Sequence, residues 1–273
     1  CQPLLAAQLT AGVRPLMKPY DPYDSLVPVF LRTDVPQRTR QFASAVFVEL
    51  HGEPFLLTAA HVTDEAKSGE LLVPTRDGLE PIEGYMAYID LPPEIRRADD
   101  TTDIAYYRLS TRFANSLAHQ FRVLRHERSE HVASAHDYVV YTASGYPASK
   151  AKKDGTKHLS EVFSFRGAIA QPDTYSELGL SPDDSIVIHF HRKPAVHHET
   201  FEAFPTPGLK GVSGGALFAW PHGQEVSQDW SLPKFVGIVH SFKEREGLII
   251  GTTFLPIVAA ILLGRMKGFG GVQ

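Results

Sequence analysis

The chain has 273 residues, 43% of them hydrophobic, and a formal net charge of −4 at pH 7. This length suffices to bury a substantial core, as one large domain or as two small barrels. The slightly acidic balance argues against nucleic acid as a partner, because binding DNA requires clustered Lys and Arg to neutralise phosphates. The chain has no run of about 18 apolar residues, so we expect no transmembrane segment.

The first 112 residues are predicted to form an extended lead-in and then a β-barrel. Residues 1–40 hold several prolines and little periodicity, which predicts an extended segment with one short strand at 27–31. Short apolar runs separated by turns then predict a first barrel over residues 41–112. Its strands are expected at 42–50, 54–59, 71–74, 84–89 and 103–109.

The rest of the chain is predicted to form a linker, a second barrel and a helix. Residues 113–135 are polar, with a candidate helix at 113–123, and are expected to join the barrels. Residues 136–273 are expected to form the second barrel and a C-terminal helix, the latter indicated by helical spacing of apolar residues over 256–266. Strands of the second barrel are expected at 137–143, 161–170, 185–191, 214–220, 235–241 and 247–254.

Three short motifs, in a fixed order, carry the chemistry. They are Thr58-Ala59-Ala60-His61, Asp103-Ile104-Ala105 and Gly211-Val212-Ser213-Gly214-Gly215. Together they supply a histidine base, a carboxylate that can orient it and a serine on a glycine-flanked turn. A serine hydroxyl is a weak nucleophile at neutral pH unless a base removes its proton, so the three motifs complement one another.

The serine motif also fits the nucleophile elbow of α/β-hydrolases, with Asp229 and His240 following it in hydrolase order. Only 60 residues follow Ser213, however, and a βαβ unit needs about 30 residues. The elbow must also lie between a strand and a helix, whereas the apolar run at 216–220 indicates a buried strand. The order His, Asp, Ser therefore favours a double barrel over a hydrolase sheet.

With these motifs the chain resembles the chymotrypsin/trypsin-fold serine peptidases, in particular the disulfide-free, trypsin-like peptidase domains of bacteria. The resemblance covers about residues 40–265. Its anchors are Leu57-Thr58-Ala59-Ala60-His61-Val62, Thr102-Asp103-Ile104-Ala105, Ser144-Gly145-Tyr146-Pro147, Gly211-Val212-Ser213-Gly214-Gly215 and Val236-Gly237-Ile238-Val239. It implies an all-β fold of two six-stranded antiparallel β-barrels with a short C-terminal helix, and an active site between the barrels.

The resemblance assigns a role to each motif residue. His61 is expected to act as general base toward Ser213 and then as general acid to the leaving amine. Asp103, rather than the nearby Asp99 or Asp100, is expected to orient the imidazole. The backbone N–H groups of Gly211 and Ser213 are expected to form the oxyanion hole, where flanking side chains would obstruct the substrate.

Two departures from the family pattern concern activation and specificity. Val212 stands where zymogen-type members have an Asp, which argues against activation by a freed N-terminus. Pro207 stands at a position where family members often have a residue that recognises a charged substrate side chain. Proline cannot do so, and a preference for Lys or Arg is therefore not supported. His240 allows an alternative, acidic specificity, although strand alternation should turn it toward Asp103 instead. The expected substrate-binding residues are Pro207, Gly208, Leu209, Lys210, His240, Ser241, Phe242 and Gly251.

A histidine cluster, formed by His189, His191, His197 and His198, raises the question of a metal. No regular ligand spacing accompanies these residues, so we expect neither a metal nor a cofactor.

The sequence thus predicts a serine endopeptidase that acts through an acyl-enzyme on protein or peptide substrates, with a narrow, regulatory specificity. The sequence is also compatible with regulation of this activity by a partner protein or an adjoining domain. The alternatives are a catalytically silent, protease-fold binding module of a larger signalling or defence protein, and a hydrolase of non-protein esters. The single cysteine, Cys1, excludes an intrachain disulfide and favours a bacterial cytoplasm. The alternative location is a membrane, reached by lipidation of Cys1.

Overall fold

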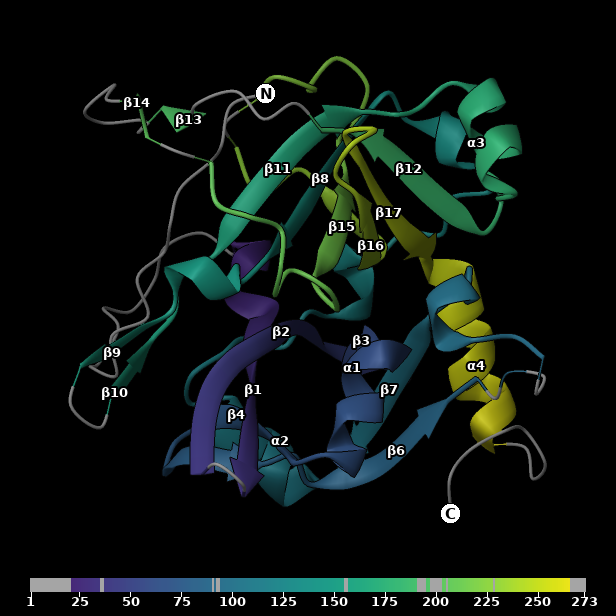
Figure 1. Ribbon diagram of the computed structural model, residues 1–273. Coiled ribbons are helices and arrows are strands. Elements are labelled where there is room, and N and C mark those ends of the chain that lie inside the picture. Colours follow the sequence, from purple (N-terminus) through teal and green to yellow (C-terminus); the bar gives the residue numbers. More distant parts are fainter. Residues whose placement is uncertain are drawn as a thin grey trace.

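Two curled antiparallel sheets form the body of the protein, as the computed structural model shows (Figure 1). It describes residues 21–34, 37–89, 91, 94–154, 157–190, 195–196, 203–204, 206–227 and 229–265. One sheet has seven strands in the order β5-β4-β1-β2-β3-β7-β6, and the other has six in the order β11-β8-β15-β16-β17-β12. The all-β, double-barrel prediction is therefore confirmed.

The first sheet has one strand more than the six expected. Its strands are β1 (Leu26–Asp34), β2 (Gln37–Leu50), β3 (Glu53–Ala59), β4 (Glu70–Thr75), β5 (Gly78–Pro81), β6 (Gly84–Tyr88) and β7 (Ile104–Leu109). The additional strand is β5, which forms a tight hairpin with β4 through Gly78 at φ +122°. Leu79 is the one large apolar residue of β5, so apolar patterning could not reveal this edge strand.

The second sheet has the six strands that were expected. They are β8 (Val140–Gly145), β11 (Phe163–Ala168), β12 (Ser185–His189), β15 (Ala216–Ala219), β16 (Lys234–Lys243) and β17 (Leu248–Thr253). Two short hairpins stand outside it: β9 (Lys152–Asp154) with β10 (Lys157–Leu159), and β13 (Ala195–Val196) with β14 (Ala203–Phe204). The pairing of β16 with β17 shifts between Val239 and Ser241, so His240 lies in a bulge. A bulge changes the direction in which a side chain points, and this one lies beside the candidate site.

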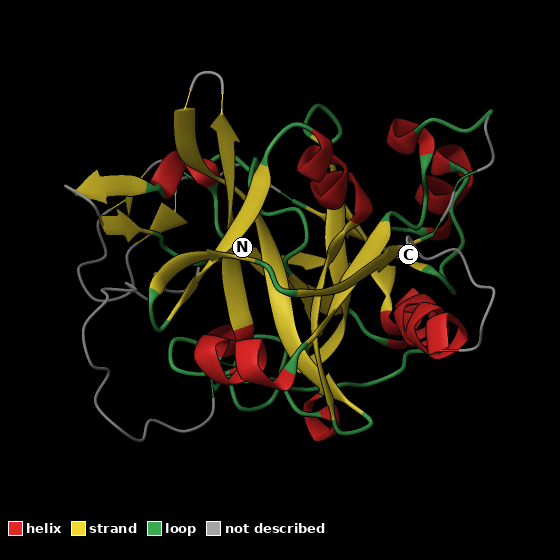
Figure 2. Cartoon of the chain, turned by 90° about the horizontal axis from the view of Figure 1, so that it is seen from below, coloured by secondary structure: helices red, strands yellow, loops and turns green. Residues whose placement is uncertain are grey.

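Helices are short and lie around the strands (Figure 2). They are α1 (Ala60–Asp64), α2 (Thr111–Leu117), α3 (Pro172–Leu178) and α4 (Phe254–Arg265), with 3-10 turns η1 (Pro22–Ser25), η2 (Glu65–Lys67), η3 (Arg97–Asp99), η4 (His126–Arg128), η5 (Ala135–Asp137) and η6 (Ala148–Lys150). The helices α2 and α4 correspond to the two predicted ones. Helix α2 begins earlier than predicted because Ser110 caps it, accepting from the N–H of Phe113 at 3.2 Å. The helices α1 and α3, of five and seven residues, were not predicted.

One of the three hydrophobic clusters joins the two sheets. It contains Leu57 and Tyr106 from the first sheet, Phe218 and Ile238 from the second, and Ile257 from α4. Each sheet also has a cluster of its own. A shared apolar core of this kind fixes the two sheets against each other, because separating them would expose it to water. Residues on the facing edges are therefore held at defined distances, which the candidate site requires.

The described residues contain neither a membrane-spanning helix nor a candidate metal site. In that part of the chain, none of the helices combines the length and apolar character needed to cross a membrane. The same residues contain no group of three or more His, Cys, Asp or Glu side chains suited to a metal ion. Of the predicted histidine cluster, His189 ends β12, whereas His191, His197 and His198 lie outside the described residues.

Candidate active site

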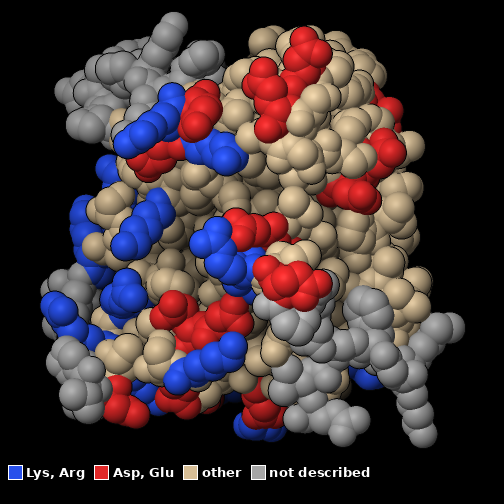
Figure 3. Space-filling view, turned by 45° about the vertical axis from the view of Figure 1, so that its right-hand side comes forward, with Lys and Arg blue, Asp and Glu red and all other residues tan. Residues whose placement is uncertain are grey.

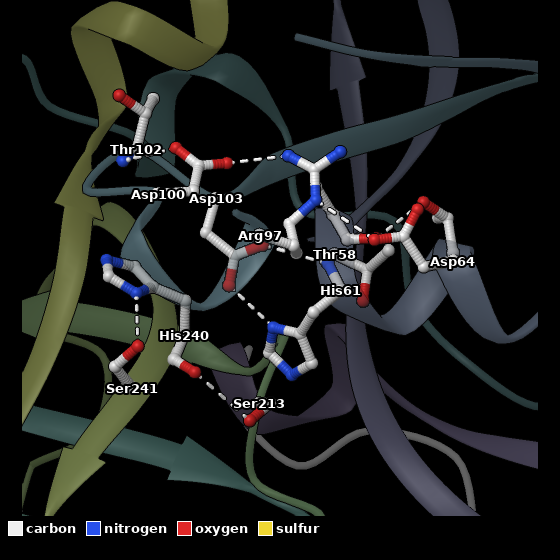
Figure 4. Close-up of polar contacts among 12 residues, drawn as sticks. Thr58, His61, Asp64, Arg97, Asp100, Thr102, Asp103, Ser213, His240 and Ser241 are labelled. Atoms are coloured by element: carbon white, nitrogen blue, oxygen red, sulfur yellow. Dashed lines mark hydrogen bonds and ion pairs between the residues drawn. The ribbon is translucent and has the colours of Figure 1, made fainter. Parts of the chain in front are cut away.

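His61 is the second residue of α1, directly after β3 (Figure 4). Its backbone N–H donates to Asp103 Oδ1 at 2.8 Å, and its Nδ1 lies 2.5 Å from Asp103 Oδ2. The two carboxylate oxygens thus hold both the backbone and the ring of the same residue. This two-point contact leaves Nε2 as the free ring nitrogen, and the close-up shows that it points toward Ser213.

Asp103 contacts His61, whereas the two neighbouring acidic residues do not. Its side chain is 5% exposed, and its backbone has φ +42°, in the left-handed region that Asp adopts more readily than most residues. Its carbonyl oxygen also accepts from the N–H of Ala60 at 3.0 Å. Asp99 instead pairs with Arg96, and Asp100 pairs with Arg97. The structure therefore brings Asp103 and His61 together, as expected.

Ser213 lies in the turn before β15, on the opposite side of the His61 ring from Asp103 (Figure 4). Its hydroxyl donates to the carbonyl oxygen of His240 at 3.3 Å. Within the described residues no hydrogen bond joins Ser213 Oγ to the His61 ring. Hydrogen bonds between a nucleophile and its base are often long without substrate and tighten when substrate binds.

The turn before Ser213 presents two unpaired N–H groups. The carbonyl oxygen of Lys210 accepts from the N–H of Ala148 at 2.8 Å. Because a trans peptide points its N–H opposite to its C=O, the N–H of Gly211 points away from Ala148. In the described part of the chain, neither this N–H nor that of Ser213 has a hydrogen-bond acceptor.

Glycine is required at position 211 by both conformation and space. Its φ is +96°, and a Cβ there would lie 2.6 Å from the nitrogen of Ala148 and 2.7 Å from the oxygen of Tyr146. Gly214 is similarly enclosed, since a Cβ would lie 2.1 Å from the oxygen of Ser44 and 2.2 Å from Thr58 Oγ1. The sequence argument assigned these glycines to substrate access. The structure adds that Gly214 permits the close approach of the first sheet.

Sequence reasoning missed Ser44, a buried residue of β2 that reaches the serine turn. Its N–H donates to the oxygen of Ser213 and its hydroxyl to the oxygen of Gly211, both at 2.8 Å. The same hydroxyl accepts from the N–H of Tyr146 at 2.8 Å. The carbonyl oxygen of Ser44 accepts from Thr58 Oγ1, also at 2.8 Å. The one sequence signal is a polar residue inside an apolar strand, which is too common to interpret.

His240 is buried, and its ring lies on the Asp103 side of the site (Figure 4). Its Nδ1 lies 2.9 Å from Ser241 Oγ, and its Nε2 has no hydrogen-bond partner among the described residues. Burial lowers the pKa of His240 to about 4, a change that the charge of Asp103 opposes and that His61 reinforces. The ring is therefore neutral at pH 7. The bulge in β16 sets the direction of this side chain.

The remaining expected pocket residues occupy different environments. Pro207 and Leu209 are buried, Lys210 is exposed, and Phe242 packs against the core of the second sheet. Gly251 pairs with Val239 within the sheet. Gly208 and Ser241 are half-buried. Val212 is fully buried.

Comparison with known proteins supports the fold. No protein-family model matches the chain, and no curated protein sequence matches it. Among solved structures, the VesB protease of Vibrio cholerae matches with a TM-score of 0.50 at 16% identity, over 88% of this chain and 64% of VesB. This chain thus spans less than two thirds of VesB. A Glu endopeptidase (TM-score 0.48, 15% identity, 90% of this chain, 92% of the other) and Tobacco Etch Virus protease (0.48, 12%, 94%, 87%) are also similar.

The chain has the double-barrel fold of the chymotrypsin-like serine proteases. The likeness to VesB concerns the fold, since identities this low carry no information on substrate. Any function must therefore be argued from the site itself.

Proposed function

We propose that this protein is a serine endopeptidase that uses Ser213, His61 and Asp103. One observation carries the proposal: Asp103 holds His61 by two contacts, and the free nitrogen of that ring faces a serine whose turn presents two unpaired N–H groups. A nucleophile, an oriented base and donors for a developing oxyanion are the parts that acyl transfer requires.

The reaction follows from this arrangement. Ser213 Oγ attacks the carbonyl carbon of the peptide bond while His61 Nε2 takes the hydroxyl proton. The former carbonyl oxygen gains negative charge and accepts hydrogen bonds from the N–H groups of Gly211 and Ser213. The C–N bond then breaks, and the amine leaves with the proton from His61. Water, deprotonated by His61, hydrolyses the ester on Ser213 and regenerates the hydroxyl.

Asp103 acts through His61 in this scheme. Its carboxylate accepts from Nδ1, which leaves Nε2 as the nitrogen that can take a proton from Ser213. Its negative charge, buried beside the ring, also stabilises the imidazolium that forms during attack.

We further propose a narrow substrate range, consistent with a regulatory peptidase of the trypsin-like group. Pro207, at the position that often reads charge, is buried and uncharged, while Lys210 is exposed. Neither residue supplies a buried carboxylate that would select Lys or Arg. His240, which could have selected an acidic residue, is buried and near enough to Asp103 for their charges to interact.

The second candidate is a protease fold kept as a binding module without catalysis. The hydrogen bond from Ser213 to His240, rather than to His61, is the observation in its favour. The paired His61 and Asp103 and the two free N–H donors argue against it, because a silent module has no need of them.

A fluorophosphonate probe tests the proposal. The folded wild-type protein should be labelled, and Ser213→Ala should abolish labelling. Ser164→Ala is the control for loss of a serine hydroxyl, since Ser164 is a buried serine whose hydroxyl pairs with Ser144 and not with a residue of the triad. Absence of labelling in the folded wild type would favour the binding module.

A peptide-library digest then separates a peptidase from a hydrolase of other esters. Cleavage at a restricted set of residues is expected. A labelled protein that cleaves esters but no peptide would overturn the peptidase assignment, and strong cleavage after Lys or Arg would overturn the argument from Pro207.

A further inference from the structure

Arg97 connects the segment that carries His61 to the segment that carries Asp103. Its Nε donates to Asp64 Oδ2 at 3.0 Å, and its Nη1 donates to Asp100 Oδ2 at 2.7 Å (Figure 4). Asp64 is the last residue of α1, three residues after His61, and Asp100 lies three residues before Asp103. We call Asp64, Arg97 and Asp100 the Arg97 clamp.

The clamp is partly shielded from water, although the side chain of Asp64 is 28% exposed. The side chain of Arg97 is 19% exposed and that of Asp100 is 4% exposed. Arg97 also lies over the ring of Tyr88, with its guanidinium carbon 5.5 Å from the ring centroid. On the face shown in Figure 3, basic and acidic side chains lie side by side over much of the surface, where such pairs contribute little. Burial gives the clamp a larger electrostatic contribution than theirs.

Asp100 also contacts Thr102, the residue before Asp103. Its Oδ1 accepts from the N–H of Thr102 at 3.0 Å, and the oxygen of Thr102 accepts from the hydroxyl of Thr252 on β17. Asp103 itself adopts φ +42°, a conformation that persists only where its surroundings determine it. Thr102, the residue before Asp103, is therefore held at its N–H by Asp100 and at its carbonyl oxygen by Thr252.

We infer that Arg97 is a positioning residue that holds the Asp103 carboxylate in register with the His61 ring; this inference rests on the proposed peptidase function. The planar guanidinium suits this task because its N–H groups form a rigid fork that can bind two carboxylates at once. Arg97 contacts neither Ser213 nor the oxyanion turn, so it acts through Asp103 and His61. Without it, Asp64 of α1 and Asp100 lose the cation they share. Among the described residues, the two segments then keep only the hydrogen bonds of Asp103 with His61 and Ala60.

The chain offers a matched control in the neighbouring residue. Arg96 pairs with Asp99 at 2.7 Å, but its side chain is 79% exposed and its partner belongs to the same turn. Arg96→Met removes an arginine and an ion pair without touching α1. Arg97→Met removes the same groups together with the link between the two segments.

The experiment measures kcat and KM on a cleaved peptide, the rate of fluorophosphonate labelling, and the NMR signal of the His61 Nδ1 proton. Arg97→Met should lower kcat about 10- to 100-fold, because a misplacement of about 1 Å can cost a catalytic step that much. KM should stay within about twofold, since Arg97 is remote from the substrate. Arg96→Met should leave all three readouts within about twofold of the wild type.

Two further variants separate positioning from simple loss of stability. Arg97→Lys keeps the charge but not the fork, so it should restore part of kcat. Asp100→Asn keeps the side-chain shape and serves if Arg97→Met does not fold. A loss of thermal stability in the Arg97 variants with kcat and the His61 proton signal unchanged would overturn the inference.

The NMR readout keeps this inference distinct from the proposed function. If the wild type does not react but the His61 proton signal is lost in Arg97→Met and kept in Arg96→Met, the peptidase proposal fails and the positioning role stands. If the wild type reacts and both variants behave alike, the positioning role fails and the peptidase proposal stands.

Discussion

The two halves of the candidate site are held in place by different kinds of contact. In the first half, which contains His61 and Asp103, the main contacts are between charged side chains. Asp103 binds His61, and the Arg97 clamp connects the segments that carry them. In the second half, which is the turn that carries Ser213, backbone hydrogen bonds hold the chain in place. Examples are the bonds from the N–H of Gly214 to the oxygen of Val239 and from the N–H of Ala148 to the oxygen of Lys210. Removing a charge should therefore damage the first half, whereas adding volume should damage the second.

Asp103→Asn tests the first half most severely. The variant keeps the size of the side chain but loses the charge and presents a donor where Nδ1 needs an acceptor. In a triad of this kind such a change costs about 10⁴ in kcat, because the ring adopts the wrong tautomer. Steady-state hydrolysis of a cleaved peptide measures the effect. Asp99→Asn is the control, and an equal loss in both variants would remove the special role of Asp103.

Gly211→Ala tests the second half by adding one methyl group and no charge. The new Cβ would meet the backbone of Ala148 and Tyr146, so the turn must shift and its N–H donors move. Loss of an oxyanion donor lowers kcat about 10²- to 10³-fold. Gly223→Ala is the matched control, since Gly223 also has a positive φ, +78°, but its Cβ would meet nothing within 4 Å. Equal kcat values in the two variants would show that the turn tolerates the displacement.

Ser44→Ala tests the contact between the halves. The substitution removes the hydrogen bonds that the Ser44 hydroxyl makes with the oxygen of Gly211 and the N–H of Tyr146, and loss of a partner for a buried polar group costs about 1–3 kcal/mol. We expect the free energy of unfolding to fall by that amount and kcat to fall about tenfold as the turn loosens. Urea denaturation and peptide hydrolysis measure the two effects. The control variant Ser164→Ala should be less stable than the wild type but keep its kcat. If Ser44→Ala also kept the wild-type kcat, Ser44 would only stabilise the fold.

His240 adds a pH dependence to the stability of the site. Its pKa in the folded state is about 4, below its value of about 6.5 in the unfolded chain, so acid protonates the unfolded state first. Stability is therefore fully present above about pH 6.5 and falls as the pH drops toward 4, by about 3 kcal/mol at most. Asn in place of His240 should flatten this slope in denaturation curves, whereas Asn in place of the exposed His222 should not. Parallel slopes for the two variants would contradict this assignment.

The fold class followed from local patterns that tertiary contacts did not override. Apolar runs such as those of β3 and β17 indicated strands, and the spacing of Ile257, Ala260 and Ile261 indicated the C-terminal helix. Elements without such a pattern escaped: β5 has a single large apolar residue, and α1 is one turn long. Short elements of this kind are stabilised by their neighbours in space rather than by their own residues.

The candidate triad could be predicted for a chemical reason. A nucleophilic serine needs a base and an orienting carboxylate, and few sequences offer His61, Asp103 and Ser213 in suitable local contexts and in this order. The glycines around Ser213 were also interpretable, since only glycine adopts the φ of +96° at Gly211 without strain. Residue type and chain order thus determined which groups could meet.

Geometry, by contrast, depended on contacts between distant residues. The Lys210 carbonyl is oriented by its hydrogen bond from Ala148, more than sixty residues earlier in the chain. The bulge that sets the direction of the His240 side chain arises from the pairing of β16 with β17. The Arg97 clamp needs α1 and η3 to come within hydrogen-bond distance. No sequence pattern encodes such distances, because they result from how two sheets pack around a shared core. The residue types determine which reaction is chemically possible. The packing determines whether the reacting atoms lie close enough for it.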